Sequence, residues 1–201
     1  MPSTKAILIW GGLAAAVFVP VVIAARSPLL QWREPIYIIA GFAGIVAMAA
    51  MFCQPLLVGG RLPGLAVRQG RQIHYVIGVV LILMVIIHVA GLWVTSPPDM
   101  LDALTFSAPT AFSTLGVFSM WLLFAAAGFA SARRHIRIRC WRMGHATCVS
   151  LGVVTAVVHA MLIEGTMGMW SKAALCLLVL AATAKAMADL RIWRSFRSRR
   201  T

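Results

Sequence analysis

Four of the five histidines form two pairs with the same spacing. His74 and His88 are 14 residues apart in the sequence, and so are His145 and His159. Because each helical residue turns the chain by about 100°, 14 residues complete almost four turns, so both members of a pair lie on one helix face, about 21 Å apart along the axis. The fifth histidine, His135, lies in an arginine-rich segment, and we expect it to be solvated.

Imidazoles in this arrangement indicate a metal-bound cofactor. If the two helices face each other, they offer a facing pair of imidazoles at each of two depths. Zinc usually takes about four ligands, and no cysteine or carboxylate accompanies the pairs. Two imidazoles on opposite sides of a planar macrocycle suit haem iron. We therefore expect His74 with His145, and His88 with His159, to bind two haems. The alternative is hydrogen bonding between helices, or a proton relay.

Two arginines lie one helical turn from a histidine. Arg71 precedes His74 by three residues, and Arg142 precedes His145 by three. A haem carries anionic propionates, so we expect these guanidinium groups to bind them, in addition to any role in membrane topology. Three glycines near the histidine faces leave room for a cofactor or for close helix packing: Gly78, Gly91 and Gly152.

The composition identifies the elements that must position these residues. The chain has 201 residues, of which 61% are hydrophobic and 11% charged, with a mean hydropathy of +0.91. Soluble domains are about 45–50% apolar and about 25% charged, so a soluble globular protein is excluded, and so is a disordered chain. Six apolar segments can each cross a bilayer core of about 30 Å as a helix. They are residues 6–24, 36–58, 73–94, 110–131, 145–163 and 173–190.

The expected architecture is an all-α integral membrane six-helix bundle, with two haems between the third and fifth spans. We expect residues 1–201 to form a single transmembrane domain without a soluble flavin or nicotinamide domain. We expect a kink or an early exit at Gln54-Pro55 and no internal repeat of whole segments. The first span is expected to be a retained anchor rather than a cleaved signal, since its apolar run is longer than a signal usually has.

The net charge of +13 follows a topological pattern. The basic residues cluster after the second span, after the fourth and in the tail, which places both termini in the cytoplasm of a bacterial-type inner (plasma) membrane. The clusters consist of Arg61, Arg68 and Arg71; Arg133, Arg134, Arg137, Arg139 and Arg142; and Arg191, Arg194, Arg197, Arg199 and Arg200. Only Arg26 and Arg33 oppose this orientation. We expect anionic lipids, and no nucleic acid, as partners of these charges.

The four cysteines show no metal-binding pattern. They are Cys53, Cys140, Cys148 and Cys176, without a CxxC or a zinc-like spacing. Three of them lie in apolar runs, and we expect them to pack as small apolar side chains.

The paired histidines on the third and fifth spans resemble those of the ferric reductase-like transmembrane domain superfamily. This superfamily includes ferric reductases, NADPH oxidases and the haem subunit of bacterial methionine sulfoxide reductase systems. The segment 141–145, WRMGH, is similar to the family's tryptophan-basic-x-x-histidine sequence at the start of span five. The resemblance covers about residues 36–188. It implies that His74 and His145 hold an inner haem b, and that His88 and His159 hold an outer one.

The resemblance also implies a function, electron transfer across the membrane by an oxidoreductase or its haem subunit. Without a GxGxxG motif, the chain is expected to take electrons from a partner, a cytoplasmic flavin reductase or a membrane quinol. The acceptors expected on the outer side are a ferric chelate, oxygen or a periplasmic protein, and the outer loop 96–109 is expected to dock a partner or cap the outer haem. The alternatives are the haem subunit of a methionine sulfoxide reductase-type system, or a haem-free small transporter with a histidine proton relay.

Overall fold

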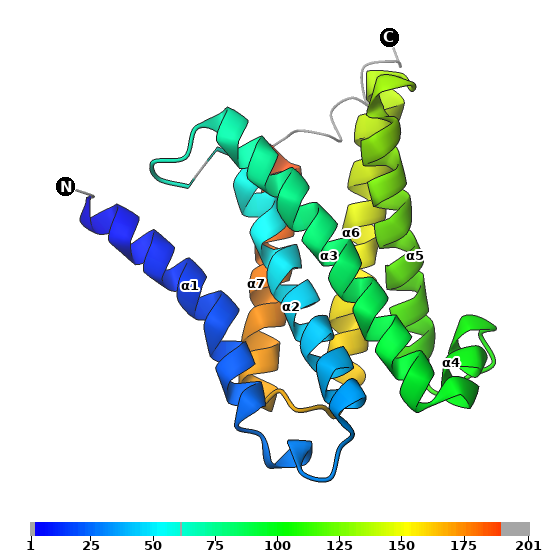
Figure 1. Ribbon diagram of the computed structural model, residues 1–201. Coiled ribbons are helices and arrows are strands. Elements are labelled where there is room, and N and C mark those ends of the chain that lie inside the picture. The colour runs from blue at the N-terminus through cyan, green and yellow to red at the C-terminus, as the bar shows by residue number, and fades with distance from the viewer. Residues whose placement is uncertain (1–2, 61, 190–201) are drawn as a thin grey trace.

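The computed structural model describes residues 3–60 and 62–189. Over these residues the chain forms seven α-helices, two short 3-10 turns and no strand. The helices are α1 Thr4–Ala25, α2 Pro35–Val58, α3 Val67–Thr95, α4 Pro97–Leu104, α5 Ala111–Ser131, α6 Ile138–Leu162 and α7 Met169–Asp189, and the turns are η1 Pro28–Leu30 and η2 Ala132–Arg134. All helices except α4 are long and apolar enough to cross a bilayer, which confirms the predicted all-α class and the six spans of a multi-pass membrane protein (Figure 1).

Two helices begin earlier than their apolar runs. α3 begins at Val67 rather than at residue 73, and α6 begins at Ile138 rather than at residue 145. The added turns are rich in arginine and other polar residues, which can lie in the membrane interface while the backbone is already helical. The Gln69 side chain accepts a hydrogen bond from the Ala66 amide at 3.0 Å, which fixes the start of α3.

The helix α2 does not end at its proline. It continues to Val58, so of the kink or early exit predicted at Gln54-Pro55 the early exit does not occur, and the kink stays a prediction. Pro55 lies in the last turn of the helix, where its missing N–H removes only one backbone hydrogen bond. As a result Gln54 stays on α2, beside α3.

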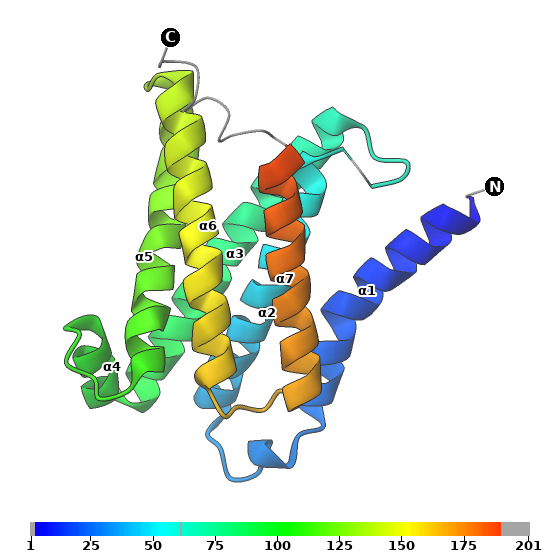
Figure 2. The ribbon, with the colours of Figure 1, turned by 180° about the vertical axis from the view of Figure 1, so that it is seen from behind.

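Two antiparallel helical hairpins, α2–α3 and α5–α6, form the body of the protein (Figures 1 and 2). The helix α7 packs against α2 and α6, and α4 packs against α3 and α5. The helix α1 contacts α2 and α7 near its end, where Pro20 and Ala24 are buried. Its first half leans away from the bundle, although the Trp10 indole still donates a hydrogen bond to the Pro63 carbonyl at 3.2 Å.

The main apolar core lies where α2, α3, α5, α6 and α7 meet. Its buried residues include Met48, Met51, Phe52, Leu81, Leu123, Val153, Ala156, Val157, Leu175 and Val179. On α3, Leu81 falls between the two histidines of that helix, and on α6 the core residues fall between the other two. The core therefore fills the interior between the two histidine depths.

Leu175 and Leu177 test this core independently of any cofactor. Leu175 is 2% exposed and Leu177 is 67% exposed on the same helix. We expect Leu175→Ala to destabilise the protein by about 2–5 kcal/mol, because it leaves a cavity. Leu177→Ala removes contacts with lipid or detergent only. Thermal unfolding in detergent measures both, and equal losses for the two variants would contradict this packing.

The two ends of the bundle differ in charge. We call the end that holds Thr4 and Asp189 the terminal end, and the opposite end, with α4 and the connections 26–34 and 163–168, the distal end (Figure 1). The described basic residues near the terminal end are Lys5, Arg68, Arg71, Arg133, Arg134, Arg137, Arg139, Arg142 and Lys185. The distal end holds Glu34, Asp99, Asp102 and Glu164, with Arg26, Arg33 and Lys172. Arg61 and the tail arginines lie outside the described residues, and the orientation in a membrane stays a prediction.

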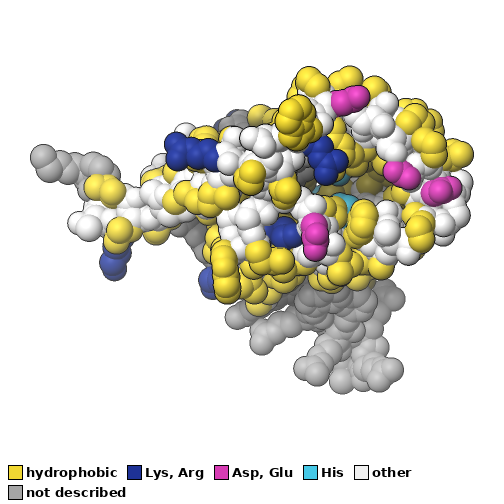
Figure 3. All heavy atoms as spheres, turned by 90° about the horizontal axis from the view of Figure 1, so that it is seen from below, with side chains coloured by type: hydrophobic (Ala, Val, Ile, Leu, Met, Phe, Trp, Pro, Cys, Tyr) yellow, Lys and Arg dark blue, Asp and Glu magenta, His cyan; other side chains and the backbone are white. Residues whose placement is uncertain are grey.

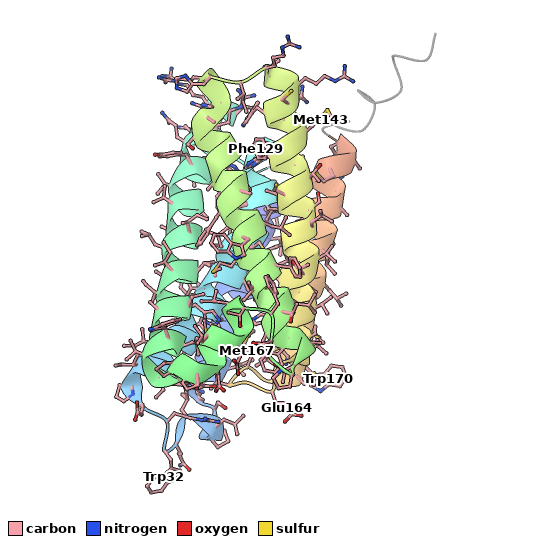
Figure 4. The ribbon with its side chains drawn as sticks, turned by 90° about the vertical axis from the view of Figure 1, so that its right-hand side faces the viewer. Trp32, Phe129, Met143, Glu164, Met167 and Trp170 are labelled. Carbon is pink, nitrogen blue, oxygen red and sulfur yellow. The ribbon has the colours of Figure 1, made fainter. Side chains whose placement is uncertain are left out.

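Two exposed tryptophans lie at the distal end. Figure 4 shows Trp32 and Trp170 projecting there, with Trp170 beside Glu164. Trp32 is 100% exposed and Trp170 is 89% exposed. Exposed tryptophans at helix ends are typical of the lipid–water interface, where the ring contacts lipid and its N–H contacts water or a headgroup.

The connection 96–109, expected as a loop, contains the helix α4. The helix starts with Pro97-Pro98, a position where proline's missing N–H costs nothing. The Ser96 hydroxyl donates a hydrogen bond to the Asp99 carboxylate at 2.5 Å. Ala103 is buried in a second, smaller apolar cluster that joins α4 to α3 and α5. The helix thus covers the α3–α5 side of the bundle at the distal end.

Candidate cofactor sites between the hairpins

The four helical histidines meet in two facing pairs. The ring centroids of His74 and His145 are 6.5 Å apart, with an angle of 68° between the ring planes. Those of His88 and His159 are 6.4 Å apart, with an angle of 83°. Each pair joins α3 of one hairpin to α6 of the other, so the predicted pairing of the rings is confirmed. The first pair lies toward the terminal end and the second toward the distal end. His135 is exposed, as expected.

A backbone carbonyl from the neighbouring helix orients every one of these rings. The Nδ1–O distances are 3.2 Å for His74 to Gln54, 2.8 Å for His88 to Ala40, 2.9 Å for His145 to Ala126 and 2.7 Å for His159 to Phe112. A carbonyl oxygen only accepts hydrogen bonds, so each Nδ1 carries the proton and donates it. In a neutral ring this leaves Nε2 with a lone pair, on the side of the ring away from its own hairpin.

The separation of the rings decides between two interpretations of the pairs. A metal–imidazole bond is about 2 Å long, so two imidazoles on opposite sides of one metal have centroids about 6.3 Å apart. A direct N–H···N hydrogen bond of about 2.9 Å would bring the centroids to about 5.2 Å. The observed 6.5 and 6.4 Å match the first value. With both Nδ1 atoms protonated, two neutral rings also lack a proton to share between their Nε2 atoms.

Two glycines make room for the distal pair. A Cβ added to Gly44 would lie 3.1 Å from Nδ1 of His88, and one added to Gly116 would lie 2.7 Å from Nδ1 of His159. Real Cβ contacts are almost never shorter than 3.0 Å, so a side chain at Gly116 would push the ring away. Neither glycine is among those predicted to leave room for a cofactor, because the contact is between helices that are distant in the sequence.

The two hairpins repeat the same geometry. Gln54 and Ala126, whose carbonyls orient the terminal pair, are 72 residues apart, and so are Gly44 and Gly116. The paired histidines are 71 residues apart. The contacts that orient the rings are therefore repeated in the two hairpins, whereas the expectation of no repeat of whole segments stays a prediction. The repeat is not visible in the residue types, because the acceptors are backbone carbonyls and every residue has one.

The polar surroundings of the terminal pair differ from those of the distal pair. Arg71 and Arg142 are exposed near the terminal end, and neither forms an ion pair with a described residue, so both are free to bind an anion. Four buried side-chain polar atoms have no hydrogen-bond partner among the residues described, and two of them, Nε1 of Trp141 and Oε1 of Gln54, belong to residues near this pair. The Gln54 amide nitrogen donates to the His74 carbonyl at 3.2 Å. At the distal pair, the ring of Phe112 lies 6.3 Å from that of His159.

The distal pair is close to the surface of its end. Figure 3 shows the distal face hollowed near its middle, with a histidine side chain visible in the hollow and acidic side chains around it.

Near the other end, Phe129 of α5 packs against Gly144 of α6, where an added Cβ would lie 2.6 Å from the ring (Figure 4).

The set of ligands at each depth is limited to two histidines. Over the described ranges, no group of three or more His, Cys, Asp or Glu side chains could hold a metal ion. A metal bound by such a pair needs further ligands from outside the chain, and the macrocycle of haem supplies four. The four cysteines are free: Cys176 is buried, Cys53 and Cys148 are half-buried, and Cys140, the one outside the apolar runs, is exposed at the polar start of α6.

Comparison with protein-family models, curated proteins and solved structures finds no match to this chain. The function is therefore argued from the geometry of the histidine pairs.

Proposed function

We propose that the chain is a transmembrane electron-transfer protein that binds two b-type haems, one between His74 and His145 and one between His88 and His159. It is then an oxidoreductase or the haem subunit of one, as its resemblance to the ferric reductase-like superfamily implies. The observation that carries the proposal is that each ring donates its Nδ1 proton to a carbonyl of its own hairpin and faces a ring of the other hairpin at 6.4–6.5 Å between centroids.

The residues present fit haem in three ways. The two imidazoles of each pair would hold the haem iron, and the carbonyl that each Nδ1 donates to fixes the ring orientation and would make the imidazole a more basic ligand. Arg71, Arg142 and the unpaired Trp141 N–H offer partners for anionic propionates near the terminal end. Bis-histidine haem iron, when bound, supplies reversible one-electron chemistry without an open coordination position.

The placement of the pairs supports transfer across the bilayer rather than along its surface. The two depths are about 21 Å apart, which is most of a hydrocarbon core of about 30 Å. We propose that electrons enter from the cytoplasm at the terminal end, from a flavin reductase or a membrane quinol. They leave at the distal end to a ferric chelate, oxygen or a periplasmic protein. The charge difference between the two ends supports this orientation.

A histidine proton relay fits the geometry less well. A relay needs polar groups or water between the two depths, but on α3 and α6 the side chains between the histidines are mostly apolar, and several belong to the core. Ser119, on α5 at this depth, already donates a hydrogen bond to the Gly152 carbonyl at 3.0 Å.

The ratio of haem to protein tests the proposal. The chain is purified in detergent after expression with added haem, and a reduced-minus-oxidised spectrum is recorded. We expect two b-type haems per chain. One haem would favour the methionine sulfoxide reductase-type subunit, with one histidine pair unused. A chain without haem would contradict the proposal and would favour a role of the histidines in hydrogen bonding or proton transfer.

Gly116 offers a test that leaves every ligand in place. Gly116→Ala should displace the His159 ring, because the new Cβ would lie 2.7 Å from Nδ1, and the haem content should fall from two per chain toward one. Gly128→Ala is the matched control on the same helix, since a Cβ there meets no atom within 4 Å. Haem content and spectrum measure both variants; two haems with an unchanged spectrum in Gly116→Ala would argue against this fit.

A further inference from the structure

Trp141 holds a buried hydrogen-bond donor without an acceptor. Its indole Nε1 is shielded from solvent and bonds to no described residue. A buried N–H that donates to nothing costs about 1–3 kcal/mol, so such groups are rare unless a ligand satisfies them. Three other tryptophans differ from it: Trp10 donates its N–H to a carbonyl, and Trp32 and Trp170 are almost fully exposed.

The position of Trp141 relates it to the terminal histidine pair. It lies four residues before His145 on α6, so both side chains lie on one face of the helix, with Trp141 one turn nearer the terminal end. An interfacial tryptophan usually turns its N–H toward water or headgroups. The buried N–H of Trp141 does not, although its helix begins only three residues earlier, at Ile138.

The other hairpin has no equivalent donor. The residue four before His74 is Gly70, and a Cβ there would lie 2.6 Å from the Leu57 carbonyl oxygen. The close contact of α3 with α2 therefore excludes a side chain at this position. Of the two positions four residues before a histidine of the terminal pair, Gly70 on α3 has no side chain, and only Trp141 on α6 supplies a side-chain hydrogen-bond donor.

We infer that Trp141 is a cofactor-positioning residue, whose indole N–H donates a hydrogen bond to a propionate of the haem held by His74 and His145. This inference rests on the proposed function. A propionate is a charged group that needs donors at the membrane boundary, and it satisfies the otherwise unpaired N–H. Arg71 and Arg142 are exposed at the same end and can bind the propionates from the aqueous side, whereas Trp141 offers its donor from within the bundle.

Trp141→Phe tests the inference, because it keeps an aromatic ring and removes the donor. The matched control is Trp121→Phe on α5, where the indole is 55% exposed and packs against Phe124. Each variant is made in the wild type and in His88→Ala, which is expected to keep the terminal haem alone. Redox titrations at several pH values give the midpoint potentials, and resonance Raman spectra report hydrogen bonding at the propionates.

We expect Trp141→Phe to lower the midpoint potential of the terminal haem, because a donor dipole that favours the added electron is lost. Its propionate should also take up a proton at higher pH, since the ionised form has lost a hydrogen bond. The propionate bands should shift, the distal haem should not change, and Trp121→Phe should match the wild type. Trp141→His, which restores an N–H, should recover part of each effect.

The outcomes separate this inference from the proposed function. A wild-type chain without haem would overturn both. Two haems with unchanged potentials and propionate bands in Trp141→Phe would overturn the role of Trp141 alone. Loss of only the terminal haem in Trp141→Phe, with recovery in Trp141→His, would support the inference. Loss of both haems in both variants would overturn it, because Trp141 would then support the fold.

Discussion

Replacing His88 by alanine is expected to reduce the haem content from two per chain to one. His88 faces His159 at a centroid distance of 6.4 Å, and the described residues offer no third ligand that could replace it. The terminal pair, His74 with His145, does not contact this site, so its haem should remain with an unchanged bis-histidine spectrum. Haem extracted from purified protein and quantified against protein mass gives the ratio.

His135→Ala is the control for this experiment. His135 is exposed in the connection between α5 and α6, and its loss should leave both haems in place. Two haems per chain in His88→Ala would contradict the pairing. Loss of both haems in a variant that still elutes as a single species would indicate that the two depths bind their cofactors together rather than independently.

Each hairpin supplies half of both sites, which links the fold to the proposed chemistry. One hairpin holds His74 and His88 and orients them with carbonyls of its own α2; the other orients His145 and His159 with carbonyls of α5. The contacts that fix each ring are thus made within a hairpin, whereas a cofactor would bind between hairpins. The rings are therefore positioned before any ligand joins the two halves, which lowers the entropy lost on binding.

The helices and the histidine pairs could be predicted because both depend on local patterns. Long apolar runs require helices in a bilayer, and the spacing of His74 from His88 fixes their common face whatever surrounds them. The apolar runs predict the starts of α3 and α6 too late, because arginines that favour the interface are helical here although they also occur in loops. The helix α4 is not predicted for a related reason, because its first turn begins with two prolines and contains the acidic Asp99.

The orientation of the rings could not be predicted from the sequence. Ala40 and Phe112 have nothing in common as side chains, yet their carbonyls accept equivalent hydrogen bonds from His88 and His159. Every residue has a carbonyl, so no residue type marks the acceptor. Gly44 and Gly116 are sequence features of this geometry, because each allows a histidine ring to approach closely. The sequence does not say which ring approaches which glycine. The unpaired N–H of Trp141 could not be predicted either, because its burial depends on how α6 packs.

Electron transfer across a vesicle membrane should require both histidine pairs. The purified chain is placed in phosphatidylcholine vesicles with ferricyanide trapped inside and dithionite added outside. With both haems, ferricyanide should be consumed. In His74→Ala or His88→Ala the haem at one of the two depths is lost, and an electron must cross a gap of about 21 Å. We therefore expect the rate of ferricyanide reduction to fall on the order of tenfold or more. The rate of electron tunnelling falls steeply with distance, which is why one remaining haem does not suffice.

The comparison between the two variants makes this test specific. Each keeps one haem, so a low rate cannot be attributed to loss of the whole protein, and His135→Ala should keep the wild-type rate. If either variant transferred electrons as fast as the wild type, the two depths would not act in series, and the 14-residue spacing would need another explanation. A low rate in both variants, with one haem retained in each, is the result that a two-step conduit requires, since each pair supplies a step that the other cannot.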